Sequence, residues 1–411
     1  MCTPRELNCI MPPHLMDRLA QSDDQDVRDA AIRTLVASAE LRGQRSILPG
    51  VAAALATPTQ GRRTIFDAHS RESLDGADMK RSESSPVSPD DSVNRAFDGL
   101  GATRKFYLDV LNRDSIDGMG MRLDGYVHYG DRYNNAMWDG KHMVFGDGDG
   151  VMFTDFTGSL TVIGHELTHG VTENTAGLEY HNQPGALNES VSDVFGSLIE
   201  QWSLNQTAEN ARWLIGPEIF TPGFDGDALR SMKDPGNAYD NPTMGKDPQP
   251  GHMNNYVPLS DTARGDNGGV HVNSGIPNKA FYLAAVNIGG RAWEAPGHIW
   301  YESLKASNST TEFQQFAETT VAKAAQLYGA DHVQAVADAW LQVGIRAASL
   351  RPAVTAIAAG GDGSLDALQG QLENLAADVR LLIDEVRADR RSKAQTTTNP
   401  HTVSRQKIKT G

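Results

Sequence analysis

The sequence predicts an α+β fold in which short strands come first and long helices follow. Between residues 125 and 148 the β-like runs are GYVHYG, NNAMW and KHMVFGDG. An Asp-Gly pair, Asp139–Gly140, separates the last two runs and indicates a tight hairpin. From residue 160 onward, apolar residues recur at the spacing of amphipathic helices. That spacing predicts helices over 160–174, 187–203, 274–288, 296–305, 311–328 and 332–345, after one over 93–112.

The chain divides into four parts along its length. Residues 1–50 carry a helical pattern, residues 51–159 hold the strand-rich part, and residues 160–346 hold the mainly helical part. Residues 347–411 begin with a glycine-rich linker and end in a polar, basic tail that we expect to be disordered. Between linker and tail, leucine and valine residues alternate at spacings of three and four over 365–386, which is typical of a coiled coil.

This heptad segment predicts self-association through residues 365–386. About three heptads are marginal for an isolated dimer, because short helices are weakly stable by themselves. Two alternatives therefore stay open. The segment could fold back as a single amphipathic helix, or it could attach the protein to a partner.

Composition excludes several classes of partner. A net charge of −15 argues against nucleic acid, since phosphate binding requires a basic surface. The two cysteines, Cys2 and Cys9, lie at the start of the chain, so the body of the protein contains no disulfide. No run is long enough to span a membrane, and the N-terminus lacks the apolar core of a secretory signal. We expect secretion by a route that needs no such signal, with a cytoplasmic location as the alternative.

The stretch TVIGHELTHGVTE, residues 161–173, carries the strongest chemical signal. On a helix, His165 and His169 lie on one face and can direct their imidazole nitrogens at a common point. Glu166 lies at the edge of that face, where it can reach a metal-bound water without being a ligand. This division of roles suits zinc-assisted hydrolysis. The alternative is a pair of ordinary surface histidines.

A catalytic zinc usually has three protein ligands and one open position, so a third ligand is required. GALNESVSDVFGSLIE supplies Glu189 on the next predicted helix. Asp193, one turn further along, can accept the second N–H of a ligating histidine, and Asn188 can do the same for the other. The alternative for these carboxylates is a solvated helix face.

Together, HELTH and NESVSD resemble the thermolysin family of zinc neutral proteases. Further segments resemble that family in the same order, over roughly residues 95–346: YNNAMWDG, LEYHN, GDALRSMKDP and DNGGVHVNSGIPNKAFYL. The resemblance implies a thermolysin-like fold of two lobes. A strand-rich N-terminal lobe and a mainly helical C-terminal lobe would flank a cleft, with the zinc helix between them.

The resemblance also implies roles for individual residues. His165, His169 and Glu189 would ligate one zinc per chain. Glu166 would be the general base that activates water and later passes its proton to the leaving amine. The oxyanion would receive hydrogen bonds from Tyr180 and His271, which meet charge that develops in the transition state. Asp266 would orient His271.

Substrate contacts are implied by the same resemblance. Asn135 and the backbone of Ala136 would bind the substrate main chain as an added strand, and Arg230 would hold a substrate carbonyl. A large apolar side chain just after the cut bond would enter a hydrophobic pocket, which predicts cleavage before Leu, Phe or Ile. The wall of that pocket would be formed by Leu229, Val162 and Ile215.

Calcium sites are where the sequence departs from the family. Long-chain members carry a double calcium site, but here Thr161, Arg212, Leu214 and Pro217 replace acidic residues and only Glu200 remains. Calcium needs six to eight oxygen ligands, so we expect the double site to be absent. A second calcium position could use Thr221 and Asp227 in FTPGFDGD. A tight glycine-rich turn is the alternative reading.

The short opening resembles the protealysin branch of the family, in which a brief propeptide blocks the cleft. Residues 1–50 would then be an inhibitory propeptide, and the protein would be made as a zymogen. The segment Pro12–Leu15, PPHL, would belong to the inhibitory part, with cleavage between residues 40 and 60. A Cys9 thiolate that caps the zinc is an additional hypothesis.

The function predicted from these motifs is a zinc endopeptidase that hydrolyses internal peptide bonds. An aminopeptidase with the same ligands is a rival, but it would need an acidic group for the free substrate amine, and no GAMEN-like segment occurs. A binding protein that keeps the fold without activity is the second rival. The intact set of catalytic positions argues against it.

Overall fold

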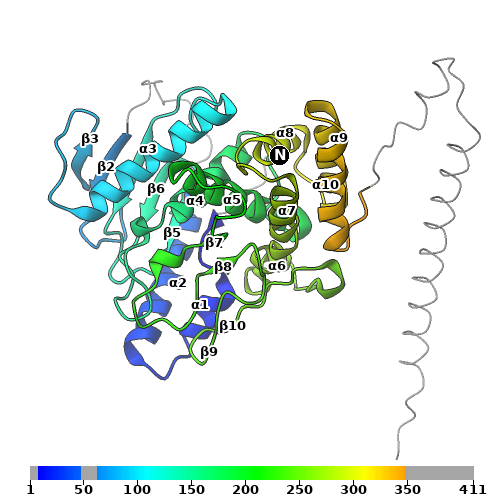
Figure 1. Cartoon of the computed structure of the whole chain (residues 1–411). Coiled ribbons are helices and arrows are strands. Elements are labelled where there is room, and N and C mark those ends of the chain that lie inside the picture. The colour runs from blue at the N-terminus through cyan, green and yellow to red at the C-terminus, as the bar shows by residue number, and fades with distance from the viewer. Residues whose placement is uncertain (1–7, 48–62, 348–411) are drawn as a thin grey trace, which may run out of the picture. The chain divides into compact units, whose positions relative to one another are not determined.

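The computed structural model describes residues 8–47 and 63–347 (Figure 1). The heptad segment over 365–386, the basic tail and most of the 40–60 interval lie outside the described residues. The predicted α+β fold is confirmed, because a six-stranded sheet lies within the first 150 residues and the residues after 160 are mainly helical. Among the described helices, none is both long enough and apolar enough to span a membrane.

The main sheet has the strand order β1-β5-β6-β4-β2-β3. Its strands are β1 (Asn8–Cys9), β2 (Arg63–Asp67), β3 (Asp78–Ser82), β4 (Leu123–Val127), β5 (Ala136–Trp138) and β6 (His142–Phe145). β2, β4 and β6 are parallel, whereas β3, β5 and β1 each pair antiparallel with a neighbour. The predicted hairpin joins β5 to β6, and Gly140 takes a φ of 95° there, a conformation that favours glycine.

Helix α3 (Asp91–Leu111) lies across the sheet and contacts β2 and β4 (Figure 1). The Asp90 side chain caps it by accepting a hydrogen bond from the Ser92 amide, at 2.9 Å. Asn112 ends it in the left-handed conformation, with φ of 51°. On its other side α3 contacts α4 (Leu160–Glu173), where the Tyr107 and Thr168 hydroxyls are 2.7 Å apart. Helix α3 therefore connects the sheet to the helix that carries HELTH.

Helices α4 and α5 (Asn182–Ser203) approach each other closely because glycines stand at their contact. A Cβ added at Gly196 would lie 2.5 Å from the Thr161 carbonyl oxygen, and one at Gly164 would lie 3.0 Å from the Gly196 Cα. No side chain fits in those spaces, so larger residues would push the helices apart. The close approach brings the next turns of both helices, which carry His165 and Asp193, within hydrogen-bonding distance.

The remaining helices pack around a core of aromatic residues. These helices are α6 (Asp266–Asn273), α7 (Gly275–Ile288), α8 (Ala295–Ala306), α9 (Phe313–Leu327) and α10 (Ala330–Gln342). The Trp300 and Trp340 rings are stacked with centroids 6.1 Å apart, and Phe281 lies edge-on to Trp300. Short strands complete this part: β7 (Leu214–Ile215), β8 (Arg230–Ser231), β9 (Asp240–Asn241) and β10 (Gly245–Lys246).

The N-terminal residues form two helices of their own, α1 (Pro13–Leu19) and α2 (Gln25–Ile47), which pack against each other (Figure 1). Pro13 begins α1 at the first helical turn, where a missing N–H costs nothing. Before α1, β1 adds to the edge of β5. A strand of two residues is too short to carry a period-two pattern, so the sequence does not predict β1.

Candidate metal centre and its cleft

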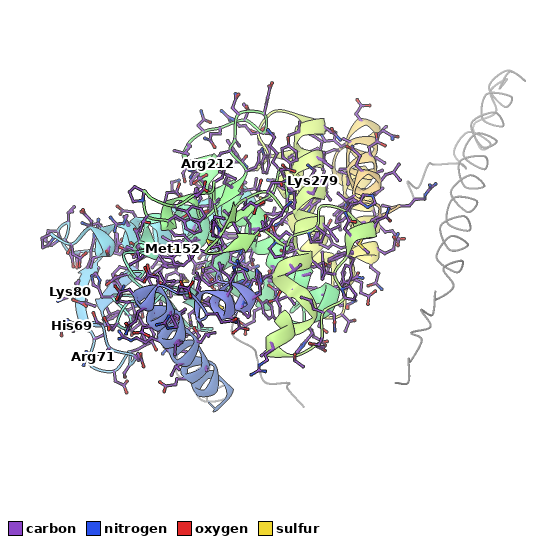
Figure 2. All side chains as sticks on the ribbon, turned by 90° about the horizontal axis from the view of Figure 1, so that it is seen from below. His69, Arg71, Lys80, Met152, Arg212 and Lys279 are labelled. Atoms are coloured by element: carbon purple, nitrogen blue, oxygen red, sulfur yellow. The ribbon has the colours of Figure 1, made fainter. Side chains whose placement is uncertain are left out.

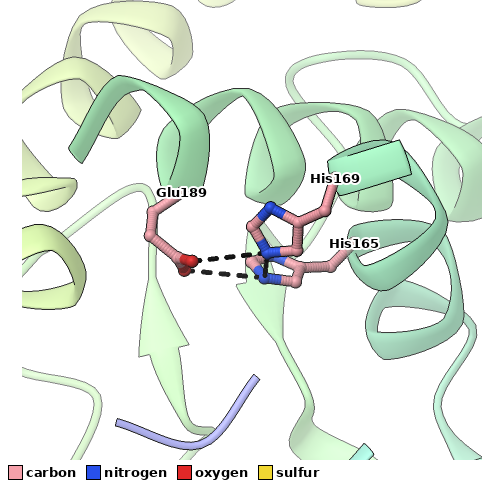
Figure 3. A group of neighbouring side chains, drawn as sticks. All are labelled: His165, His169 and Glu189. Carbon is pink, nitrogen blue, oxygen red and sulfur yellow. Dashed lines mark hydrogen bonds and ion pairs between the residues drawn. The ribbon is translucent and has the colours of Figure 1, made fainter. Parts of the chain in front are cut away.

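His165, His169 and Glu189 converge on one buried point between α4 and α5 (Figure 3). The Nε2 atoms of the two histidines are 3.0 Å apart. One Glu189 carboxylate oxygen lies 3.5 Å from His165 Nε2, and the other lies 3.3 Å from His169 Nε2. All three side chains are 0–1 % exposed. Among the described residues, this is the single group of metal-ligand side chains with such geometry.

The hydrogen bonds around the triad fix the histidine tautomers. His165 Nδ1 is 2.8 Å from the Asp193 carboxylate, and His169 Nδ1 is 2.8 Å from the Asn188 amide oxygen. Both partners are acceptors, so both Nδ1 atoms carry the proton and both Nε2 atoms present lone pairs. Two lone pairs and a carboxylate that face each other in a buried site repel unless a cation lies between them. The donor set therefore fits a divalent cation such as zinc.

Charges around the triad favour this ligand state. Burial lowers the pKa of His165 to about 4, which keeps its ring neutral. For Glu189, burial raises the carboxyl pKa, but neighbouring histidines, above all His271, outweigh it and hold the pKa well below its usual range. Neutral imidazoles and an ionised carboxylate are the forms that bind metal.

Asp193 is the central residue of the network behind the triad. Its carboxylate also accepts two hydrogen bonds from Arg230, both 2.8 Å, and one from the Asn278 side chain at 2.9 Å. Burial raises its pKa, but Arg230 and His165 hold it at about 2. Asp193 is therefore ionised throughout the physiological range and keeps His165 in one orientation.

Glu166 lies beside the triad without belonging to it. The Trp138 amide of β5 donates to one Glu166 oxygen at 2.9 Å, and the Ile10 amide also lies close to this carboxylate. The other Glu166 oxygen is buried without a well-formed hydrogen bond from the described residues. Burial raises the pKa of this carboxyl well above its usual value, partly opposed by the Trp138 amide. A buried carboxyl with a raised pKa and one free oxygen has the properties of a proton carrier.

Tyr180, His271 and Asp266 form a second cluster next to the triad. The Tyr180 hydroxyl donates to Glu189 and lies 3.2 Å from His271 Nε2. Asp266 accepts from the His271 amide at 2.8 Å and contacts its Nδ1 at 2.5 Å. Burial lowers the pKa of His271, but Glu189 and Asp266 raise it to about 9. His271 is therefore a cationic donor at neutral pH.

The contact between Asp266 and His271 depends on a run of residues in the left-handed backbone conformation. The residues 266–269 all have φ between 48° and 85° before α6 continues as a regular helix. This tight turn brings the carboxylate back toward the first helical amides. Gly268 and Gly269 accept such φ values without strain, which explains the GG of DNGGVH.

The chain's own N-terminal segment lies along β5 and contacts the predicted site residues. β1 pairs with β5, with Cys9 opposite Met137. The Ile10 amide donates to the Ala136 carbonyl at 3.4 Å, and the Met11 amide donates to the Asn135 side chain at 3.3 Å. In Figure 3, a blue stretch of this segment runs past the triad.

Two carbonyl groups of the segment contact the predicted site residues. His271 Nε2 donates to the Cys9 carbonyl at 3.0 Å, and Arg230 Nη1 donates to the Ile10 carbonyl at 3.0 Å. Ile10 and Met11 are 0 % and 1 % exposed. Two groups are predicted to bind the oxyanion. His271 donates to a carbonyl of this segment, whereas the Tyr180 hydroxyl is directed at Glu189.

The predicted pocket residues lie in the buried core beside the cleft. Leu229, Val162 and Ile215 are at most 2 % exposed and belong to the same apolar cluster as Ile10. Ile10 and the three residues predicted to form the pocket wall are therefore buried in one continuous apolar core.

Helices α1 and α2 hold the segment in place. Apolar side chains of α1, Leu15, Met16 and Leu19, are at most 3 % exposed. The Arg18 guanidinium donates to the Thr243 and Pro242 carbonyls at 3.0 and 2.9 Å. From α2, the Thr34 hydroxyl accepts from the Asn134 amide at 2.9 Å, next to the edge strand.

The hypothesis that Cys9 caps the metal is wrong for this structure. The described metal-ligand group does not include Cys9. Its thiol is 3.6 Å from the Met11 carbonyl and packs in an apolar cluster with Tyr129, Tyr133 and Met137. Because successive strand residues face opposite sides, the register that directs the Cys9 carbonyl at His271 leaves the thiol elsewhere.

Arg212, which is labelled in Figure 2, lies at the expected position of a double calcium site. Its guanidinium is paired with two carboxylates. Its Nε is 3.0 Å from Glu200, and its Nη2 contacts both Glu200 and Glu218. The Thr161 hydroxyl accepts from the Gly216 amide at 2.9 Å. At the other proposed position, the Thr221 hydroxyl donates to the Val151 carbonyl at 2.8 Å and Asp227 is exposed.

Three contributors to the site do not follow from the motifs. The Ser192 hydroxyl is 3.0 Å from His169 Nδ1, so it shares that proton with Asn188. Asn278 contacts Asp193, and the Trp138 amide contacts Glu166. Ser192 lies one helical turn after Asn188, and that spacing is the one sequence signal that could have identified it.

Comparisons with known proteins agree with this geometry. The family profile described as "Thermolysin metallopeptidase, catalytic domain" matches residues 58–173, and "Thermolysin metallopeptidase, alpha-helical domain" matches residues 176–345. A Pectobacterium carotovorum subsp. carotovorum protein named extracellular metalloprotease is 45% identical over 343 residues, which are 83% of this chain and 97% of that one. Protease PrtS of Photorhabdus sp. (strain Az29) is 50% identical over 286 residues, 69% of this chain and 76% of that one.

A solved structure is also similar. It is described as the precursor of protealysin, a metalloproteinase from Serratia proteamaculans. It superposes with a TM-score of 0.74 at 45% sequence identity and covers 82% of this chain and 99% of that one.

Proposed function

Since this chain belongs to the thermolysin family of zinc-dependent metallopeptidases, we propose that it is an endopeptidase made as a zymogen, which cuts before large apolar residues with Glu166 as its base. Its identity as a metalloendopeptidase follows from the family. The residue roles, the specificity and the zymogen are proposals supported by the contacts described above.

The observation that carries the proposal is the convergence of three lone-pair donors on one buried point. His165 and His169 direct their Nε2 atoms at Glu189, and each Nδ1 is held by an acceptor. We assign these three residues as the zinc ligands, with Asp193 and Asn188 as the groups that orient the two histidines. Zinc bound there would lower the pKa of a water molecule into the neutral range.

Glu166 accepts the proton of the attacking water and delivers it to the leaving amine. One of its oxygens is buried and unpaired, which supports this role, because that oxygen is available to accept a proton from water and to donate it to the leaving amine. Water attack places negative charge on the substrate carbonyl oxygen. His271, oriented by Asp266, donates to that oxygen, and Tyr180 joins it once its hydroxyl is released from Glu189.

Substrate binds as a strand antiparallel to β5. Asn135 and the Ala136 backbone hold its main chain, and Arg230 holds the carbonyl of the residue after the cut bond. The contacts of the N-terminal segment support this mode, because the segment uses the same groups. The apolar residues Leu229, Val162 and Ile215 favour Leu, Phe or Ile just after the cut bond.

Residues 1–50 act as the inhibitory propeptide. Their contacts with Asn135, Arg230 and His271 leave no room for a substrate strand, which supports inhibition by direct competition. The likeness to a precursor structure agrees with this proposal. Removal of the segment would then start activity on other proteins.

The remaining proposals concern metals, location and assembly. One zinc would be bound per chain and the double calcium site would be absent, which is supported by the Arg212 pairs with Glu200 and Glu218. Calcium at Thr221 and Asp227 stays a proposal without a supporting contact. Secretion is supported by the extracellular relative. Self-association through 365–386 also stays a proposal.

Metal analysis together with peptide hydrolysis tests the function. The full chain, incubated until its N-terminal segment is removed, should contain one zinc and cut peptides before Leu, Phe or Ile. Glu166→Gln should keep the zinc and lose activity by about a thousandfold. Glu302→Gln on α8 is the matched control and should change neither. Full activity in Glu166→Gln would refute the assignment of the base.

A further inference from the structure

The N-terminal segment does more than cover the cleft, because its main-chain groups are matched one by one to the groups proposed for substrate. Four contacts define the match. They join the Cys9 carbonyl to His271, the Ile10 amide to Ala136, the Ile10 carbonyl to Arg230 and the Met11 amide to Asn135.

We propose that the Cys9–Ile10 peptide bond is cut by the chain's own active site, so that the precursor is first converted into a form that begins at Ile10. The inference rests on the proposed function and adds a processing site to it. This site lies far from the 40–60 interval in which removal of the whole propeptide is expected.

The register of the segment identifies the bond. The carbonyl that a hydrolase attacks must face the oxyanion donor, and the Cys9 carbonyl is the one that His271 contacts, at 3.0 Å. The amide on the other side of the same bond is that of Ile10. It faces the Ala136 carbonyl at 3.4 Å and the Glu166 carboxylate, which is the group that must protonate the leaving nitrogen.

The neighbouring contacts exclude a different bond. In a strand, successive carbonyl groups point to opposite sides, so a shift by one residue would turn the Cys9 carbonyl away from His271. The same shift would remove the Ile10 carbonyl from Arg230 and the Met11 amide from Asn135. Ile10, which follows the bond, also has the large apolar side chain that the pocket is expected to prefer.

The reaction is an ordinary hydrolysis. One water adds across the bond: its oxygen joins the Cys9 carbonyl carbon, and the C–N bond breaks. Glu166 passes the proton to the Ile10 nitrogen. The products are a new carboxylate on Cys9 and a new amino group on Ile10, and no other reactant is needed.

The described contacts on the two sides of the bond differ in kind. On the N-terminal side they include the two-residue strand β1, the Cys9 carbonyl contact with His271 and the Cys9 thiol cluster. On the C-terminal side, Met11 is buried, Arg18 holds the Thr243 and Pro242 carbonyls, and α2 packs behind α1. After the cut, residues 1–9 are released and Ile10 onward stays docked as a bound product.

Intact mass and N-terminal sequencing of the zinc-loaded full chain test the inference. We expect residues 1–9 to be lost and the new chain to start at IMPPH. Because the bond and the site belong to one chain, the rate constant should not change over a tenfold dilution. Glu166→Gln should slow the cut about a thousandfold, and Ile10→Asp should slow it at least about a hundredfold, because a carboxylate is costly to bury.

Ile10→Leu is the matched control and should be cut at the same bond. If Ile10→Asp does not fold, Ile10→Ala replaces it and should slow the cut about tenfold, since less apolar surface is buried. Hydrogen–deuterium exchange tests the docking without cleavage. In Glu166→Gln, which should leave the bond intact, the amides of Ile10 and Met11 should exchange slowly with deuterated water. Ile10→Asp added to that variant should restore fast exchange.

The outcomes separate this inference from the proposed function. A preparation that hydrolyses an added peptide while its own Cys9–Ile10 bond stays intact, or is cut elsewhere, overturns the inference alone. Fast exchange at Ile10 and Met11 in Glu166→Gln also overturns it. A zinc-loaded preparation that hydrolyses no peptide of any kind overturns the proposed function, and the inference with it.

Discussion

The metal centre and the N-terminal segment that covers it are held by different forces. At the centre, each of the three histidines has a partner behind it: Asp193 holds His165, Asn188 holds His169 and Asp266 holds His271. The cover uses backbone hydrogen bonds and apolar burial instead. Paired charges in a buried network resist rearrangement, whereas an added strand can leave without breaking that network. The difference agrees with the proposed zymogen, in which the site stays fixed and the N-terminal segment is removed.

His14 is the weak point of the cover. Neither of its ring nitrogens reaches solvent or a hydrogen-bond partner among the described residues, although the residue as a whole is partly exposed. It lies near Asp266, His271 and Arg230, the last two of which disfavour a second positive charge. An unpaired buried polar group costs free energy, and nothing comparable occurs at either metal-ligating histidine.

Removing Asp193 should have the largest effect. Asp193→Ala leaves the Arg230 guanidinium buried without its partner, and such losses cost about 3–5 kcal/mol in the free energy of unfolding. Zinc affinity should fall about 10- to 100-fold, because His165 loses its orienting group. Denaturant unfolding and zinc titration measure both. Asp124→Ala, which breaks the more exposed Arg122 pair, is the control and should cost less than about 1 kcal/mol.

Acid should loosen the cover before it affects the centre. Burial lowers the pKa of His14 from 6.5 to about 4 in the docked segment. Above pH 6.5 the ring is neutral whether docked or free. Between pH 6.5 and 4 the free segment binds a proton that the docked one does not, so docking weakens as pH falls, by up to about 3 kcal/mol.

Proteolysis or amide exchange of residues 9–19 in Glu166→Gln, measured from pH 7.5 to 4.5, checks this prediction. His14→Leu should remove most of the pH dependence. If wild type and His14→Leu loosen in parallel as pH falls, His14 is not the responsible group.

Removing Ser192 should have the smallest effect. Ser192→Ala deletes one of two acceptors for the His169 Nδ1 proton, while Asn188 stays in place at 2.8 Å. We expect a loss of about 1 kcal/mol in stability and less than tenfold in zinc affinity. Asn188→Ala is the comparison, and it should cost more because its side chain also donates to the Leu178 carbonyl. A larger loss in Ser192→Ala would show that the orienting groups are not redundant.

The sequence predicts the metal centre well because its signals are local. His165 and His169 lie one helical turn apart, and Glu189 and Asp193 share the next helix at the same spacing. The short spacing of these residues along their helices is therefore enough to predict nearly all of the metal ligands. The contact that joins the two helices, Gly164 against Gly196, is not periodic and follows only from the packed structure.

The cover could not be predicted in the same way. Its pairing joins Cys9 to Met137 and Arg230 to Ile10 across more than a hundred residues, through a strand of two residues. The side that the Cys9 thiol faces depends on that register, so a cysteine near the start of the chain was compatible with a metal cap until the pairing was known. Likewise, the sequence shows that carboxylates are missing around Arg212, but not that Arg212 pairs with Glu200 and Glu218.

The most direct test of a fixed centre under a removable cover is to follow zinc content and peptide hydrolysis while the N-terminal segment is lost. The account predicts one zinc per chain at every time, with hydrolysis of an added peptide low at first and rising as the segment is removed. Full hydrolysis with the segment still docked, or a chain that binds no zinc in either form, would contradict it.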